Sequence, residues 1–216
     1  MTISEGVKQK GNPYWIPNTK RSDLPAFFVS KGFKKGVEIG VSWAQNIIDY
    51  CEAGLEIYGV DPWAESTDEE TYRKVISIDG KYGKTAEGVY QLAKQRTEKY
   101  PNCHLMRMTS FEAIEHFPDR SLDFVYIDGN HTFGHVAMDL MKWCRKVKKG
   151  GVIAGHDYYS HSEKQQRVYR GVGAIVRAFA DAYDYNEPGN SWFVLGSKEK
   201  QEDEESTLSF MFIKNW

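Results

Sequence analysis

The middle of the chain alternates short apolar runs with segments whose apolar residues recur at helical spacing. Short apolar runs are typical of buried strands, and the recurring spacing is typical of helices that cover them. Strands separated by helices imply βαβ units and a parallel sheet. The expected strands are 36–40, 56–60, 103–108, 122–127 and 151–154. The expected helices are 43–53, 71–78, 86–100, 111–116 and 133–147, the last with an apolar face of Val136, Leu140, Met141 and Trp143.

The C-terminal third has a different pattern. A helix over 172–183 is followed by two β-like runs, 191–195 and 208–213, with a charged segment at 198–205 between them. Two such runs joined by a polar turn predict an antiparallel hairpin. The chain is therefore expected to form an α/β fold whose parallel sheet ends in that hairpin.

The first 34 residues stand apart from this pattern. Residues 12–24 are too few for a domain, yet they are rich in aromatic and proline residues. Two interpretations stay open, namely an arm packed on the domain or a lid over a ligand. The expected organisation is an arm or lid at 1–34 and one domain at 35–216.

Composition limits the classes of protein that fit. Hydrophobic residues make up 41% of the 216 residues and charged residues 27%, which excludes a disordered chain. A net charge of −2 gives no overall basic excess, so no nucleic-acid partner is expected. The three cysteines are scattered, which favours reduced thiols and a cytoplasmic protein. No apolar run approaches the ~20 residues of a membrane span, so no membrane partner is expected either.

Acidic residues mark the carboxyl ends of the first two expected strands. Glu38 lies two residues before Gly40, and Asp61 ends the second strand. Ligands of open α/β sheets bind at these ends, where a glycine lets the backbone approach closely and an acid accepts hydrogen bonds from ribose. The alternative is that Asp61 only opens a turn. Ser42 and Gln45 fit a capping box that would start the first helix.

The glycine-rich dinucleotide motif is missing after the first strand, since Ala44 and Gln45 follow Gly40 without further glycines. That absence argues against a pyrophosphate and makes a dinucleotide oxidoreductase the weakest hypothesis. Glu38 suits a cation or a free amine better than a phosphate.

These features resemble class I S-adenosylmethionine (SAM)-dependent methyltransferases. The resemblance rests on the segments at 37–40 and 59–61, on the alternation of strands and helices and on the terminal hairpin. It implies a Rossmann-like, seven-stranded, mostly parallel sheet with an antiparallel C-terminal hairpin and helices on both faces. It also implies a SAM site, with Gly40 beside the methionine, Asp61 at the ribose and Ser110 near the adenine. Asn46 matches a polar position at the methionine carboxylate or amine, and Glu38 and Asp128 complete the expected cofactor site.

A second group of polar residues follows the fourth and fifth strands. Asp128 ends the fourth strand, and Asp157 lies 29 residues later, enough for one crossover helix. Neighbouring strands lie ~4.8 Å apart, so the two carboxylates can converge at one edge of the sheet. Two carboxylates suit Mg²⁺. The alternative is an Asp-Gly turn at Asp128 and a helix cap at Asp157.

The segments 127–131 and 155–158 are similar to those of metal-dependent small-molecule O-methyltransferases that act on macrolide and aminocoumarin sugars. The resemblance implies that Asp128 and Asp157 are metal ligands and that His131 is the general base. The alternative for His131 is a histidine at a helix start, bonded to backbone. His156 departs from the pattern, in which an acidic residue often precedes the second aspartate. His156 is also counted among the expected metal ligands. Because imidazole is a poor ligand of Mg²⁺ and favours transition metals, the expected ion is Mg²⁺ or another divalent metal.

The sequence thus predicts a SAM-dependent O-methyltransferase whose partner is a small hydroxylated acceptor, assisted by a divalent metal. Methyl transfer to a hydroxyl needs an aligned donor and a means of removing the proton, and both have candidates here. The alternative is a SAM- or nucleoside-binding protein of the same fold without transferase activity. Self-association into a homo-oligomer is compatible with either hypothesis.

Overall fold

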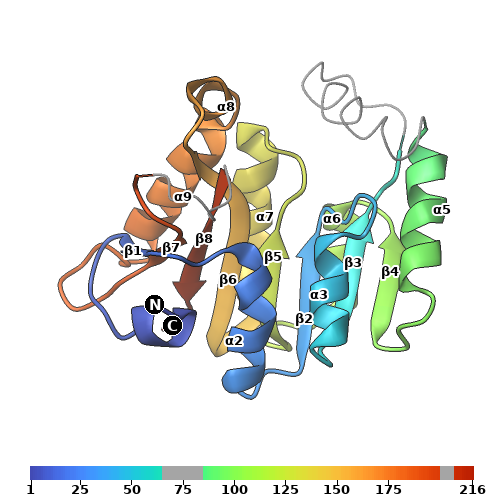
Figure 1. Cartoon of the computed structure of the whole chain (residues 1–216), viewed down its shortest axis with the longest axis horizontal. Coiled ribbons are helices and arrows are strands. Elements are labelled where there is room, and N and C mark those ends of the chain that lie inside the picture. The colour runs from blue at the N-terminus through green and yellow to red at the C-terminus, as the bar shows by residue number, and fades with distance from the viewer. Residues whose placement is uncertain (65–84, 200–206) are drawn as a thin grey trace.

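The computed structural model describes residues 1–64, 85–199 and 207–216. Within these ranges, eight strands form one sheet in the order β1-β7-β8-β6-β5-β2-β3-β4 (Figure 1). All neighbouring strands run parallel except β8, which is antiparallel to β6 and β7. This arrangement confirms the α/β fold with a C-terminal hairpin. The strands are β1 (Tyr14–Ile16), β2 (Lys35–Ile39), β3 (Glu56–Asp61), β4 (Cys103–Arg107), β5 (Leu122–Ile127), β6 (Val147–Ser160), β7 (Phe193–Leu195) and β8 (Thr207–Ile213).

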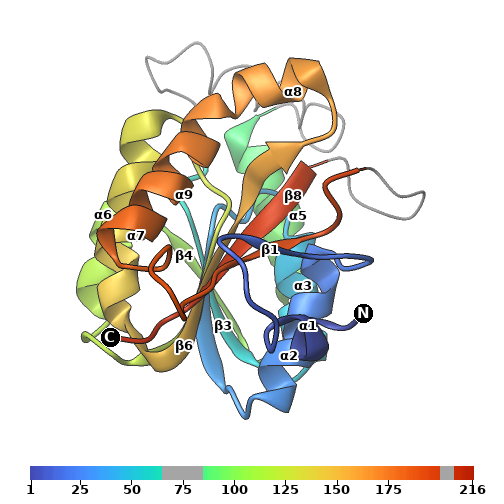
Figure 2. The same cartoon turned by 90° about the vertical axis from the view of Figure 1, so that its left-hand side faces the viewer.

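Helices cover both faces of the sheet. Figure 2 shows α6, α7 and α9 on one face and α1, α2 and α3 on the other. The helices are α1 (Ile3–Gly6), η1 (Arg21–Asp23), α2 (Leu24–Ser30), α3 (Asn46–Glu52), α5 (Ala86–Thr97), α6 (Ser110–Ala113), η2 (Ile114–His116), α7 (Phe133–Lys146), α8 (Glu163–Val168) and α9 (Arg170–Ala182). None of these described helices has both the length and the apolar character that a membrane crossing requires.

The alternating side chains of the central strands build the two halves of the core. In β5, Val125 and Ile127 pack with α7 and α9, whereas Phe124 and Tyr126 pack with α2 and α3. Successive residues of a strand point to opposite faces, so a strand that is apolar throughout must be covered on both sides. The buried pattern of β5 therefore requires the two helical layers.

Helix α7 shows how far the apolar pattern holds. Val136, Leu140 and Trp143 are buried as expected, but Met141 is 59% exposed. Met141 follows Leu140 directly, and one residue turns a helix by about 100°, which carries this side chain off the buried face. The prediction for Met141 was wrong.

The start of α3 and the length of β6 differ from expectation. Helix α3 begins at Asn46 rather than at 43, because Ser42 and Ala44 have φ of 48° and 63° in the left-handed region. The predicted capping box is therefore absent at Ser42. Strand β6 extends well beyond 151–154, with an irregularity between Gly155 and Tyr159 that lets the strand continue past the site. The helix expected over 71–78 lies outside the described residues.

The N-terminal segment contributes a strand to the sheet. β1 pairs in parallel with β7 at the sheet edge, with Trp15 opposite Val194. The sheet therefore has one strand more than the seven expected. Trp15 also packs edge-on against Tyr159 of β6. The segment thus lies along the domain, and its action as a lid stays a prediction.

Candidate active site

The site lies where the strand order reverses. β2 and β5 are neighbours, but the chain runs from β2 to β3 and β4 on one side and from β5 to β6 on the other. Such a reversal opens a crevice at the carboxyl ends of the strands. A cavity of about 490 Å³ lies there, a size typical of small-molecule sites. Its wall includes all nine residues predicted from the sequence to bind the cofactor or the metal or to act on the substrate, namely Glu38, Gly40, Asn46, Asp61, Ser110, Asp128, His131, His156 and Asp157. These nine residues lie in or after four strands, β2, β3, β5 and β6, and at the starts of α3 and α6.

Gly40 allows two loops to meet at the floor of the cavity. Its φ is 86°, and a Cβ at this position would lie 2.1 Å from the backbone oxygen of Asp128. The amide of Asp128 in turn donates to the carbonyl of Ile39 at 2.8 Å. Any larger residue at position 40 would push the loop after β2 away from the loop after β5. Gly40 therefore allows two backbone segments to meet, and it also lets the backbone approach the cavity.

Asp61 organises the turn that follows β2. Its Oδ2 accepts hydrogen bonds from the amides of Val41 at 3.1 Å and Ser42 at 3.0 Å, and its Oδ1 accepts from the amide of Trp63 at 2.8 Å. These bonds hold Ser42 in the left-handed conformation that replaces the expected capping box. The ribose role of Asp61 stays a prediction.

Glu38 is a buried carboxyl group with one oxygen unused by the described residues. Its side chain is 2% exposed, and its Oε1 accepts a hydrogen bond from Asn46 Nδ2 at 2.7 Å. Its Oε2 has no hydrogen-bond partner among the described residues. Burial raises the pKa of Glu38 to about 8, although the Asn46 bond opposes that rise. An unsatisfied buried oxygen is costly, so this position favours a ligand that donates to it.

Ser110 opens α6 and is tied to α7. Its hydroxyl donates to Asp139 Oδ1, and its Oγ accepts from Trp143 Nε1 at 2.7 Å. Asp139 also lines the cavity, and the sequence analysis did not single it out. The available signal was its place three residues after Val136 and four before Trp143, on the face of α7 that is otherwise apolar. A buried acid on such a face needs a polar partner.

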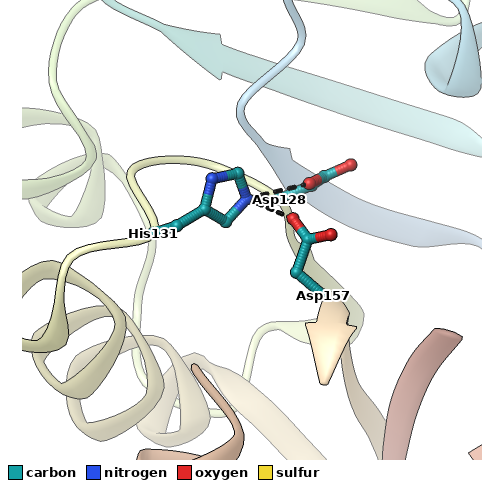
Figure 3. A group of neighbouring side chains, drawn as sticks. All are labelled: Asp128, His131 and Asp157. Atoms are coloured by element: carbon teal, nitrogen blue, oxygen red, sulfur yellow. Dashed lines mark ion pairs between the residues drawn. The ribbon is translucent and has the colours of Figure 1, made fainter. Parts of the chain in front are cut away.

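Asp128, His131 and Asp157 converge in the wall of the same cavity (Figure 3). His131 Nε2 lies 2.5 Å from Asp157 Oδ2 and 3.5 Å from Asp128 Oδ1. One ligand atom from each of the three residues falls within 4.8 Å of the others. This spacing is compatible with a shared cation, because metal ligands in proteins lie about 2 Å from the ion.

His156 contacts the same carboxylates from a separate position. Its Nδ1 lies 3.0 Å from Asp157 Oδ1 and 3.9 Å from Asp128 Oδ1. Asp157 therefore has one oxygen near each histidine. The structure groups His131 with the two aspartates, whereas the sequence pattern had assigned His156 to the metal and His131 to the base.

The two carboxylates control the charge of His131. Burial opposes protonation of the imidazole, but the contacts with Asp128 and Asp157 outweigh burial and raise the pKa of His131 to about 10. Burial likewise opposes ionisation of Asp157, yet the two histidines hold the pKa of Asp157 below its usual range. With no cation between them, these groups therefore form a charged cluster at neutral pH.

Arg21 reaches this cluster from the N-terminal segment. Its guanidinium Nη1 donates a hydrogen bond to Asp128 Oδ2 at 3.2 Å, and Arg21 also lines the cavity. The sequence analysis placed residues 12–24 in an arm or a lid but did not connect Arg21 with Asp128. Nothing in the local pattern indicates this contact, since 107 residues separate the two positions.

Solved methyltransferase structures share the fold. The chain matches the O-methyltransferase of Bacillus cereus in complex with S-adenosylhomocysteine (SAH) with a TM-score of 0.57 and 11% identity, over 98% of this chain and 87% of that one. SAH-bound Podospora anserina methyltransferase PaMTH1 gives 0.57 and 12%, over 90% and 78%. The N-methyltransferase NodS of Bradyrhizobium japonicum gives 0.54 and 11%, over 91% and 95%. At these identities the likeness shows the fold alone, and it does not separate O- from N-methylation.

Sequence comparison gives the family. The uncharacterized protein y4gI of Sinorhizobium fredii is 27% identical over 128 residues, which are 56% of this chain and 13% of that protein. The chain thus spans only a small part of that relative's length. Residues 35–158, more than half of the chain, match the family described as methyltransferase domain. The chain therefore belongs to the methyltransferase domain family and has the class I fold of SAM-dependent methyltransferases.

Proposed function

We propose that the protein transfers a methyl group from SAM to a hydroxyl oxygen of a small molecule, with a divalent cation held at Asp128 and Asp157. The observation that carries the proposal is one cavity whose wall contains two different groups. These are Glu38, with a buried oxygen that has no partner among the described residues, and the Asp128–His131–Asp157 cluster. Donor and acceptor subsites in one cavity are what methyl transfer requires.

The cavity residues fit SAM. The free Oε2 of Glu38 suits the ammonium group of the methionine moiety, because an ion pair would satisfy an otherwise costly buried acceptor. Asp61 and Ser110 stand farther along the same wall for the nucleoside. The SAH bound to the Bacillus cereus and Podospora anserina proteins supports this assignment. When bound, SAM supplies an electrophilic methyl group on a sulfonium.

The acidic cluster fits a cation. Asp128 and Asp157 are partly and fully buried carboxylates, and His131 completes a set of three donor atoms. A divalent ion would replace Arg21 and the histidine charges as the partner of the aspartates, and it would lower the pKa of a bound acceptor hydroxyl. Carboxylates favour Mg²⁺ or Mn²⁺, whereas His131 and His156 favour transition metals.

Within this proposal, some side chains align the cofactor and another removes the proton from the acceptor hydroxyl. Glu38 and Asn46 hold the amine of the cofactor, and Asp61 fixes the loop after β2. His131 accepts the hydroxyl proton at Nε2 once its own proton has been lost, because only a neutral imidazole is a base. Aromatic side chains of the cavity wall, among them Trp43, Trp63 and Tyr169, exclude water from the reacting groups.

Turnover with SAM over a panel of hydroxylated acceptors tests the proposal. The panel should contain sugars, polyols and phenols, and product is detected by mass spectrometry with and without a chelator. Methylated product that disappears on chelation supports O-methylation assisted by a metal. Product on amines alone would contradict the hydroxyl acceptor.

A binding protein without transferase activity is the second candidate. Two departures from the methyltransferase pattern favour it: Ala44 and Gln45 stand where further glycines are expected, and His156 stands where an acidic residue often precedes the second aspartate. Tight SAH binding with no methylation across the acceptor panel, at saturating Mg²⁺ and Mn²⁺, would support this candidate.

Replacing Asp61 with alanine should weaken SAH binding by about 1–3 kcal/mol, since the variant loses a partly buried acceptor for the ribose. Isothermal titration calorimetry measures the change. Asp61→Asn is the matched variant, because its amide keeps one acceptor oxygen for the amides of Val41 and Ser42. Unchanged affinity in a folded Asp61→Ala variant would show that Asp61 shapes the turn and does not bind the ribose.

Glu38→Gln should make the stability of the ligand-free protein less dependent on pH. The pKa of Glu38 is about 8 in the folded protein against 4.5 for the free side chain. The folded state therefore retains a proton that the unfolded chain releases, so this group's contribution to stability is full below pH 4.5 and is lost as the pH rises through about 8. At ~1.4 kcal/mol per pKa unit, the loss is on the order of a few kcal/mol. Thermal melts above pH 8 should show Glu38→Gln to be more stable than the wild type.

The same substitution should weaken SAH binding, because a neutral amide cannot form an ion pair with the ammonium group. Binding to the wild type below pH 8 should release a proton from Glu38, which calorimetry in buffers of different ionisation enthalpy detects, and Glu38→Gln should lack that contribution. Glu115→Gln, at an exposed position, is the control. Equal SAH affinity and equal proton release in wild type and Glu38→Gln would remove Glu38 from the cofactor site.

A further inference from the structure

Cys51 and Cys103 bring two free thiols together between α3 and β4. Cys51 lies one residue before the end of α3, and Cys103 is the first residue of β4. The Cys51 thiol donates a hydrogen bond to the sulfur of Cys103. Both side chains belong to the apolar cluster that packs α2 and α3 against the sheet. The proposed site lies at the carboxyl ends of the strands, so this pair of thiols lies at the opposite end of the sheet.

Hydrogen bonds on both sides of the pair fix its position. Asn102, the residue before Cys103, donates from Nδ2 to the carbonyl of Cys51 at 3.0 Å and to the carbonyl of Leu55 at 2.8 Å. The amide of Cys103 donates to the carbonyl of Tyr100 at 3.1 Å. These bonds hold the end of α3 against the start of β4. The contact between the thiols therefore follows from the fold of the backbone.

The two thiols differ in reactivity. The hydrogen bond from Cys51 lowers the pKa of Cys103, although partial burial opposes that shift. The same bond, together with burial, raises the pKa of Cys51. Cys103 is also the more accessible of the two, since Cys51 is 4% exposed and Cys103 is only partly buried. Because the thiolate is the nucleophile of thiol chemistry, Cys103 is the sulfur that reacts first.

We infer that Cys51 and Cys103 form a reversible disulfide by exchange with a small-molecule disulfide such as oxidised glutathione. The Cys103 thiolate attacks one sulfur of the reagent, a bond between Cys103 and glutathione forms, and the other glutathione leaves as a thiolate. Cys51 then loses its proton and attacks the Cys103 sulfur, which releases the second glutathione as a thiolate. The pair gives up two electrons and two protons, and the reagent becomes two molecules of glutathione thiol.

The disulfide would fasten α3 to β4, the last strand of the described sheet (Figure 1). Asn46, the first residue of α3, donates to Glu38 of the cavity, so the same helix connects the thiol pair with the proposed site. A link between residues 51 and 103 closes a long segment of the chain, and such a link stabilises a fold chiefly by restricting the unfolded state. Oxidation should therefore raise the melting temperature.

Equilibration of the wild type with mixtures of reduced and oxidised glutathione tests the inference. Free thiols are then alkylated, and the linked peptides are identified by mass spectrometry. The folded protein should form the Cys51–Cys103 disulfide at ratios about 10- to 1,000-fold more reducing than those that link the chain unfolded in urea. The oxidised protein should melt at a higher temperature than the reduced one, because folding and disulfide formation favour each other by the same factor. Disulfide formation in urea alone would overturn the inference.

Serine variants separate a pair of thiols from two independent ones. Cys51→Ser should accumulate a mixed disulfide between Cys103 and glutathione, which the wild type resolves, and Cys103→Ser should leave Cys51 unmodified. Cys144→Ser is the matched control and should behave as the wild type does, because the buried Cys144 thiol donates to the carbonyl of Met141 at 3.3 Å. No more mixed disulfide in a folded Cys51→Ser than in the wild type would contradict the exchange. If Cys51→Ser does not fold, the comparison of folded and unfolded wild type still decides.

Discussion

Replacing His131 with alanine should lower the turnover of methyl transfer by about 100- to 10,000-fold, the range that a positioned general base contributes. His131 lies 15% exposed in the wall of the cavity, with its Nε2 beside Asp157 and Asp128. His156 Nδ1 faces the same two carboxylates at longer distances, 3.0 Å and 3.9 Å against 2.5 Å and 3.5 Å for His131 Nε2. Single-turnover rates with saturating SAM and metal measure the effect, and His116→Ala, at an exposed position, is the control.

The pH dependence of the rate tests the same role. A base acts only when deprotonated, so the rate should rise with pH through the pKa of His131 and fall below it. In the ion-free cluster that pKa is about 10, because the contacts with the two carboxylates outweigh the opposing effect of burial. A cation bound to the aspartates offsets their negative charge and thereby lowers the pKa of His131. The low-pH side of the pH–rate profile, its acidic limb, should therefore move to lower pH when metal is added.

Metal binding separates the two roles open to His131. If His131 is the base, His131→Ala should retain most of its affinity for Mn²⁺ and should lose the acidic limb. If His131 is a ligand, as its position within 4.8 Å of the two carboxylates allows, the variant should bind Mn²⁺ more weakly. A variant with wild-type turnover and an unchanged acidic limb would exclude both roles.

The sheet could be predicted from the sequence because its central strands are apolar throughout. The run at 122–127 coincides with β5, the run at 36–40 is shifted from β2 by one residue, and the run at 56–60 ends one residue before β3 does. Strand β1 could not be predicted in this way. Its three residues form a strand only by pairing with β7, far along the chain, and such pairing leaves no local pattern.

The sequence predicts which residues meet in the cavity, but it does not predict the contacts between them. The positions of Glu38, Asp61, Asp128 and Asp157 follow from acids at strand ends, which topology brings to one edge. Which histidine lies between the two carboxylates depends on side-chain direction, and the left-handed φ of 59° at Asp157 turns the chain in a way that spacing does not show. Arg21 is equally hidden, since it reaches Asp128 through the fold of the N-terminal segment.

Asp157→Asn should weaken the binding of Mn²⁺ or Mg²⁺ by at least about 10- to 100-fold, the loss typical of removing a polar group that supports a metal site. Asparagine is the suitable replacement, because Asp157 has a left-handed φ that Asn tolerates and alanine does not. The variant should keep SAH affinity within about threefold, because Glu38 and Asp61 lie on β2 and β3, apart from β6. It should also lower the pKa of His131, since one of the two carboxylates that raise it is gone.

Metal titration followed by manganese electron paramagnetic resonance, and SAH titration by calorimetry, measure the two affinities on the same preparation. Asp119→Asn is the matched control, because Asp119 is a carboxylate with exposed ion pairs to Arg145 and Lys146 at the protein surface. Loss of metal binding with retained SAH binding would assign Asp157 to the cation. Turnover that survives both Asp157→Asn and exhaustive chelation would remove the cation from the reaction, and proton removal would then depend on His131 alone.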